Sequence, residues 1–320
     1  MALNPVQGDV HVNGPLGNIS VAHIQSAAGF VAGRAFPGIS SDKQSDLYYR
    51  YPRGEFNRNM MRKRAAGAQS AGAGYKVDTD TYSADVWALH KDIPDQVRAN
   101  ADSPLNMDRD ATIFLTQQSL LNREIEWTSS FFTAGVWTTD VTPGTLWSAS
   151  GSTPIADIRT GVKTVLESTG FKPNTLILGY EVYNVLIDHA DIIDRVVYGA
   201  QPGRISQADI PEFKSLLKID NILVMEGIQN TANEGASDVH AFIGGKNALL
   251  CYAAPTPGIM TPSAGYTFNW SGMFGAQAEG ARMKKFRMEA EASDRVEIES
   301  AYVQKVVSAD LGYFFEAVVA

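Results

Sequence analysis

A long segment with few aliphatic side chains constrains this chain more than any other feature. Only nine of the 69 residues from Phe36 to Pro104 are Phe, Leu, Ile or Val, and a segment below roughly 20% struggles to bury a core of its own. The same segment is rich in tyrosine and arginine, a composition typical of surfaces that become buried against another chain. It therefore predicts an extended arm or long hairpin that needs a partner. A solvated surface loop is the alternative, although structureless loops of this length are uncommon.

The middle of this segment carries the signals of a turn. Small residues and glycine dominate residues 65–74, which indicates a hairpin tip. Tyrosine and threonine are frequent in the two flanks, residues 46–53 and 75–89, and these residue types favour strands. We therefore expect the flanks to pair as the strands of a hairpin.

Positive charge is concentrated between residues 50 and 64, where six cations are offset only by Glu55. The whole chain carries a net charge of −8. Three interpretations stay open: pairing with acidic patches on a neighbouring copy, contact with phosphates, or a solvated face. A basic arm on an acidic body favours association of copies into closed rings. The candidate subunit-contact residues are these cations and the adjacent tyrosines: Arg50, Arg53, Arg58, Arg62, Lys63, Arg64, Tyr48, Tyr49 and Tyr51.

The rest of the chain reads as a mixed α/β (α+β) fold. Ile113, Leu120 and Trp127 recur at seven-residue spacing, which predicts one long helix over about 108–134 that ends at Gly135. Helix and strand patterns then alternate from Thr153 onward, which indicates a unit with its own core. Residues 296–302 alternate in the manner of a strand, and the chain closes with the apolar residues 312–319. This pattern predicts terminal strands that are tied into a sheet.

The motifs of common enzymes are missing from the sequence. There is no glycine-rich phosphate loop, no nucleophile elbow and no pair of histidines at the spacing of a helical metal site. The single cysteine, Cys251, lies in an apolar run and is expected to be a buried thiol. We therefore expect no catalytic residue, no cofactor and no metal. No apolar run approaches the roughly 20 residues of a membrane-spanning helix, so a membrane partner is not expected.

Several runs of residues resemble a known family. Residues 29–37, 42–51 and 88–101, together with residues 170–179, are similar to the major capsid proteins of tailed bacteriophages. The resemblance extends from about residue 25 to the end of the chain. It implies the Hong Kong-97 fold, in which an N-terminal arm, an extended hairpin loop, a peripheral domain with a long spine helix and an axial domain follow one another.

On this resemblance the chain divides into five parts. They are an N-terminal arm (1–35), the extended loop (36–97), a peripheral domain with the spine helix (98–146), the axial domain (147–281) and the C-terminal strands of the peripheral domain (282–320). The terminal strands are expected to complete the peripheral sheet.

The resemblance also implies a function. It predicts a structural protein, not an enzyme, that assembles into hexamers and pentamers of an icosahedral head shell around double-stranded phage DNA, which it contacts without sequence specificity. Only about 25 residues precede the matching region, so a separate scaffolding protein is expected. A portal and a decoration protein are further expected partners. The expected location is the virion, and the host cytoplasm during assembly.

Two other functions compete with this interpretation. An encapsulin-type bacterial compartment is thought to share the fold but encloses enzymes. An ordinary α/β enzyme would use the long segment as a lid, which the missing motifs and the length of the segment disfavour.

Overall fold

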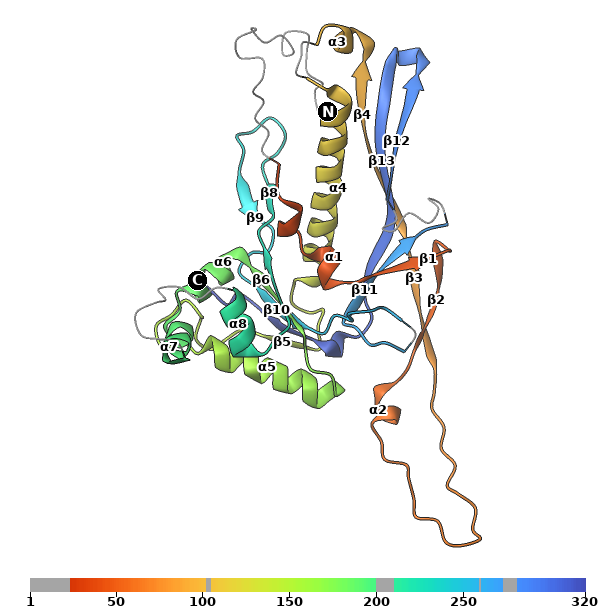
Figure 1. Ribbon diagram of the computed structural model, residues 1–320, viewed down its shortest axis with the longest axis vertical. Helices are drawn as coiled ribbons and strands as arrows, with labels where there is room; N and C mark the ends of the chain where they lie inside the picture. The colour runs from red at the N-terminus through yellow and green to blue at the C-terminus, as the bar shows by residue number, and fades with distance from the viewer. Residues whose placement is uncertain (1–23, 102–104, 200–209, 259, 273–280) are drawn as a thin grey trace.

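The computed structural model describes residues 24–101, 105–199, 210–258, 260–272 and 281–320. It shows two five-stranded sheets, one long helix and a hairpin that projects from the body (Figure 1). Residues 1–23 of the predicted N-terminal arm lie outside the described residues. Within the described ranges, no helix is long and apolar enough to cross a membrane.

The first sheet is organised around its longest strand, β13 (Ser293–Val306). One end of β13 pairs with β12 (Ala281–Met288) and β4 (Asp85–Pro94), and the other end pairs with β11 (Gly265–Trp270), always antiparallel. The short strand β1 (Gly38–Ser41) adds to β11 in parallel. The length of β13 thus lets it serve two groups of partners in one sheet.

The long helix α4 (Met107–Phe131) lies along this sheet (Figure 1). Asn106 caps its start, because its side chain accepts a hydrogen bond from the backbone N–H of Arg109 at 3.1 Å. The long-helix prediction is confirmed, but the expected end at Gly135 is wrong. The helix stops at Phe131, whose carbonyl accepts a hydrogen bond from Trp137 Nε1 at 2.8 Å. The chain turns back between Phe131 and Trp137, and Gly135 lies in this turn with a φ of +86°.

The second sheet has both faces covered. Its strand order is β5 (Thr139–Val141), β14 (Gly312–Phe315), β10 (Ala248–Cys251), β6 (Thr175–Gly179) and β7 (Asn221–Met225). One face packs on α5 (Pro154–Thr169), α6 (Tyr180–Ile187) and α8 (Ile210–Leu217); α7 (Ala190–Gly199) lies beside them. The other face packs on the end of α4 and on residues 30–36.

Strand β14 corrects one sequence-based prediction. The terminal strands were expected to complete a single sheet, but β14 pairs with β10 and β5 in the second sheet, while β13 belongs to the first. Tyr313 and Phe315 face the helices, and Phe314 faces α4. A strand that is apolar on both faces gains most from a position inside a covered sheet, which explains its place.

The remaining elements are short. They are α1 (Ala32–Ala35), α2 (Arg53–Phe56), α3 (Asp95–Ala99), the paired strands β2 (Ser45–Arg50) and β3 (Asp78–Ser83), the paired strands β8 (Ile228–Asn230) and β9 (His240–Phe242), and the 3-10 helices η3 (Ala27–Gly29), η4 (Glu289–Glu291) and η5 (Ala309–Leu311). The division into five domains predicted from the sequence stays a prediction, because sheet pairing alone does not define domain boundaries.

Phe36 packs where the two sheets and α4 meet. Its ring is fully buried, 5.7 Å from the Trp127 ring and 5.0 Å from the Phe131 ring. Gly265 of β11 leaves space for it: a Cβ at residue 265 would lie only 2.4 Å from the Phe36 ring. The absence of a side chain at Gly265 is thus a packing requirement.

We expect the substitution Gly265→Ala to lower the free energy of unfolding by about 1–3 kcal/mol, because the added methyl group overpacks the core. Urea denaturation followed by tryptophan fluorescence measures the change. Gly144→Ala is the control, since nothing lies within 4 Å of its Cβ position. Equal stability of both variants would contradict the packing role of Gly265.

Candidate functional site

The projecting hairpin begins with β2 and β3, which pair from Ser45↔Ser83 to Arg50↔Asp78. Beyond them, residues 51–77 continue as a long loop that extends away from the body (Figure 1). We call residues 45–83 the hairpin and residues 51–77 its loop. The predicted pairing of the flanks is confirmed. The predicted second flank, residues 75–89, is nevertheless divided, because β4 leaves the hairpin and pairs with β13.

The base of the hairpin is fastened to the body by aromatic stacking. The Tyr82 ring stacks on Phe268 of β11 at 4.5 Å with an interplanar angle of 2°, and the Tyr48 ring lies 5.5 Å from Phe268. Tyr48 is therefore engaged within its own chain. Burial, together with its hydrogen bond to Asp80, raises the pKa of Tyr48.

An ion pair completes this fastening. Lys305 of β13 places Nζ 2.9 Å from Asp80 Oδ1 and 5.5 Å from the centre of the Tyr48 ring. The hydrogen bond from Lys305 holds the pKa of Asp80 below its usual range. The base of the hairpin thus carries both an apolar and a charged contact with β13 and β11.

The other two candidate tyrosines, Tyr49 and Tyr51, do not pack on the body as Tyr48 does. Tyr49 has 72% of its surface exposed. Tyr51 lies 6.1 Å from both Phe56 and Tyr75, measured between ring centres, and these three rings join the two legs of the loop. Of the three candidates, Tyr49 thus has the surface most accessible to another chain.

The predicted cations are all exposed, but they are not equivalent. Arg53 forms an ion pair of 2.9 Å with Asp310 of the body. Arg64 donates a hydrogen bond to the carbonyl of Ala68 in the loop turn. The remaining four form no ion pair within the part of the chain that the structure describes: Arg50, Arg58, Arg62 and Lys63. These four are the cations that remain available to a partner.

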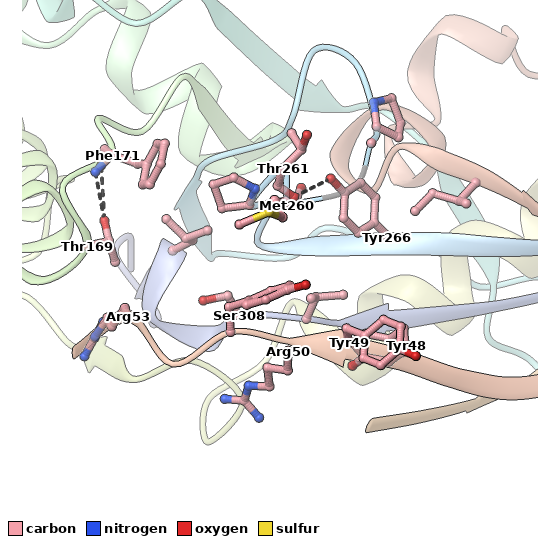
Figure 2. A pocket seen from close by; sticks show the side chains of 18 of the residues that line it. Tyr48, Tyr49, Arg50, Arg53, Thr169, Phe171, Met260, Thr261, Tyr266 and Ser308 are labelled. Atoms are coloured by element: carbon pink, nitrogen blue, oxygen red, sulfur yellow. Dashed lines mark hydrogen bonds between the residues drawn. The ribbon is translucent and has the colours of Figure 1, made fainter. Parts of the chain in front are cut away.

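An open groove of about 760 Å³ lies between the hairpin base and the body. Figure 2 shows Tyr49, Arg50 and Arg53 on one side of it, and Phe171 and Met260 on the other. Sequence reasoning missed this groove. The hairpin wall and the body wall of the groove come from segments more than a hundred residues apart in the chain, so no local sequence pattern predicts it.

One serine–histidine contact resembles a catalytic pair but is arranged differently. His189 Nε2 lies 2.9 Å from Ser152 Oγ, and His189 Nδ1 accepts a hydrogen bond from the backbone N–H of Asp191. With Nδ1 as acceptor, a neutral His189 carries its proton on Nε2 and donates it to Ser152. The imidazole therefore cannot act as a base toward Ser152, which is itself buried. This contact instead joins the loop before α5 to the start of α7.

Other reactive groups were also located. Burial raises the pKa of the Cys251 thiol to about 12, so this cysteine is a neutral core residue, as predicted. Among the described residues, no three His, Cys, Asp or Glu side chains gather into a metal site.

A family comparison identifies the chain. Residues 128–292, from the last part of α4 to the turn between β12 and β13, match the family described as phage major capsid protein E. The chain belongs to this family. A major capsid protein of Pseudomonas phage JBD67 is 24% identical over 250 residues, 77% of this chain and 78% of that protein. The major capsid protein of Burkholderia phage BcepMu is 28% identical over 131 residues, 39% of this chain and 40% of that protein.

Solved structures show the same fold in other proteins. A phage-related protein from Bordetella bronchiseptica RB50 aligns with a TM-score of 0.69 at 18% identity, covering 91% of this chain and 92% of that one. An encapsulin from Synechococcus elongatus aligns with a TM-score of 0.59 at 11% identity, covering 100% and 98%. The Hong Kong-97-type α+β fold of this major capsid protein is therefore established, as the sequence resemblance predicted.

The ion pair at the hairpin base predicts a local effect of pH and mutation. The substitution Asp80→Asn removes the negative charge that Lys305 contacts. A partly exposed ion pair of this kind contributes about 0–1 kcal/mol to stability. We expect amide exchange in β2 and β3 to accelerate by up to about fivefold. Asp85→Asn is the control, because Asp85 is exposed and lies just outside the hairpin.

The pKa of Asp80 is depressed in the folded chain. The ion pair therefore stabilises the hairpin base at pH values above the ordinary aspartate pKa of about 3.9, and this stabilisation is lost as pH falls through the lower pKa of the folded state. Hydrogen exchange of β2 and β3 at neutral pH and at acidic pH tests this. If the difference between Asp80→Asn and the unmodified chain persisted at pH values where Asp80 is protonated, the ion pair would not explain it.

Proposed function

We propose that this major capsid protein assembles into hexamers and pentamers of an icosahedral head shell that encloses double-stranded DNA, with the hairpin of each copy lying on a neighbouring copy. The observation that carries the proposal is the hairpin itself. Isolated two-stranded hairpins are marginally stable in water, and the loop of this one extends well beyond the aromatic contacts at its base. Contact with a second copy would supply the missing burial.

Charge supports the choice of a second copy as the partner. Residues 50–64 carry six cations and one carboxylate within a chain of net charge −8, so the remainder of the chain carries −13. Opposite charges on two surfaces steer their association and fix their register. Among the three interpretations of the cluster we therefore favour docking on a neighbouring subunit. Phosphate contact and a solvated face become alternative outcomes of the experiments.

Further partners belong to the same proposal. A portal and a separate scaffolding protein would take part in building such a shell, and a decoration protein would bind its outside. DNA would be enclosed without sequence-specific contacts. The protein would act as a structural component of the virion, without enzymatic activity, after assembly in the host cytoplasm. The arrangement of Ser152 and His189 supports the structural role, because it disfavours that pair as a catalytic one.

The encapsulin alternative rests on the shared fold alone. A structural similarity at 11% identity does not separate the contents of two kinds of shell. The family match and both relatives, in contrast, are phage capsid proteins. The phage head is therefore the function that the comparisons favour.

Deleting residues 58–74 tests the central claim. We expect the body to stay folded, because these residues contribute no side chain to the buried clusters, whereas shell assembly should be lost. Circular dichroism and thermal unfolding report on the body, and negative-stain microscopy reports on the shells. Closed shells of normal size from the shortened chain would refute the role of the loop.

Charge reversal at the loop tests the partner. We expect the triple variant Arg62→Glu, Lys63→Glu, Arg64→Glu to assemble poorly, because an unfavourable contact is repeated at every symmetric interface. The charge-preserving variant Arg62→Lys, Arg64→Lys is the control and should assemble. Normal assembly of the reversed variant with reduced DNA content would favour phosphate contact. Normal assembly of the reversed variant with normal DNA content would indicate that the basic cluster is a solvated face.

A further inference from the structure

A buried carboxylate contacts the N-terminal end of the described chain. Glu124 lies in the second half of α4, and only 1% of its surface is exposed. Its oxygens accept hydrogen bonds from the backbone N–H of Val31 at 2.9 and 3.0 Å and from that of Ala32 at 2.8 Å. The partners of this buried acid are thus backbone amides.

The charged groups around Glu124 are engaged elsewhere. Arg34 of α1 donates to the carbonyl of Ala28 at 2.7 Å, and the guanidinium of Arg123 of α4 lies over the Tyr302 ring at 5.4 Å. Both cations lower the pKa of Glu124 by their charge but form no ion pair with it among the described residues. Glu226, at the end of β7, is exposed and bonds to this region through its backbone N–H, which donates to Gly29.

The two amides that donate hydrogen bonds to Glu124 belong to a segment that is otherwise held by apolar packing. We call residues 30–36 the strap. Its side chains Val31, Ala35 and Phe36 are fully buried between α4 and the second sheet. Apolar packing alone would leave the buried amides of Val31 and Ala32 without an acceptor, and a buried N–H without a partner is destabilising. Glu124 satisfies both and thereby fixes the strap in one position along α4.

We propose that Glu124 is a positioning residue that fastens the strap to α4, that it sets where the N-terminal part of the chain leaves the body, and that acidification tightens this fastening. The inference concerns the single subunit. It rests on the proposed function only for its consequence in assembly, which is the position of the strap relative to neighbouring copies.

The effect of pH follows from burial. Desolvation raises the pKa of Glu124 above its ordinary value, and this outweighs the hydrogen bonds and the two arginines. The docked strap therefore binds the proton of Glu124 more strongly than a released strap, in which the side chain is solvated. Protonation of Glu124 therefore stabilises the docked strap. This stabilisation is complete below the ordinary glutamate pKa of about 4.3 and is lost as pH rises through the raised pKa of the docked state.

Hydrogen exchange of the Val31 and Ala32 amides in the unassembled full-length chain tests the proposal. We expect Glu124→Ala to accelerate their exchange at least tenfold, because both amides lose their acceptor. Glu124→Gln keeps one acceptor oxygen and should exchange nearly as slowly as the unmodified chain. Glu126→Ala, two residues away on the same helix, is the matched control and should leave the exchange unchanged.

The pH profile separates positioning from general destabilisation. After division by the intrinsic exchange rates of unstructured peptides, protection of the strap should increase in the unmodified chain and in Glu126→Ala as the pH falls from neutral toward the ordinary glutamate pKa of about 4.3. It should stay flat in Glu124→Gln. Unchanged exchange in Glu124→Ala, or an identical pH profile in Glu124→Gln, would overturn the proposal. Should Glu124→Ala fail to fold, the profile of Glu124→Gln decides alone. Because unassembled subunits are measured, a failure of shell assembly counts against the proposed function and not against this inference.

Discussion

The burial of Phe36 against the aromatic end of α4 is the contact on which the rest of the structure depends. Its ring touches Trp127 and Phe131 of the helix, and the cluster around it continues to Ile177 and Phe314 of the second sheet. The chain runs from Phe36 directly into β1 of the first sheet. One apolar junction therefore holds both sheets and the helix together, and it fixes the place from which the hairpin departs.

The hairpin shows the opposite balance of forces. Its base is held by Phe268 and Lys305, whereas its loop gains little from its own chain apart from three aromatic rings and the ion pair of Arg53. A loop with so few contacts of its own holds one conformation only when another surface packs against it. In the proposed shell each copy would supply a hairpin to one neighbour and offer a surface to the hairpin of another.

The sequence predicted the large elements because their signals are local. The seven-residue spacing of apolar side chains in α4 and the paired flanks of the hairpin were both recognisable from neighbouring residues. The predictions failed where a strand had to choose a partner. β14 is a short apolar strand whose residues do not indicate its partner, and β4 follows the hairpin with only Ala84 between β3 and β4. The contribution of each candidate residue was likewise hidden: Tyr48 and Arg53 are engaged within the chain, while Tyr49 is exposed.

By itself, the sequence determined that this chain has a segment unable to form its own core, a basic loop on an acidic body, and a family resemblance that the comparisons then confirmed. Composition and short-range spacing are sufficient for such statements, because they depend on what each residue is and on its near neighbours. Only the tertiary structure decided which strands share a sheet, where the groove lies, and that Glu124 accepts the amides of a segment more than ninety residues away. These features depend on contacts between distant segments, and such contacts arise only when the burial of Phe36, Trp127 and their neighbours brings those segments together.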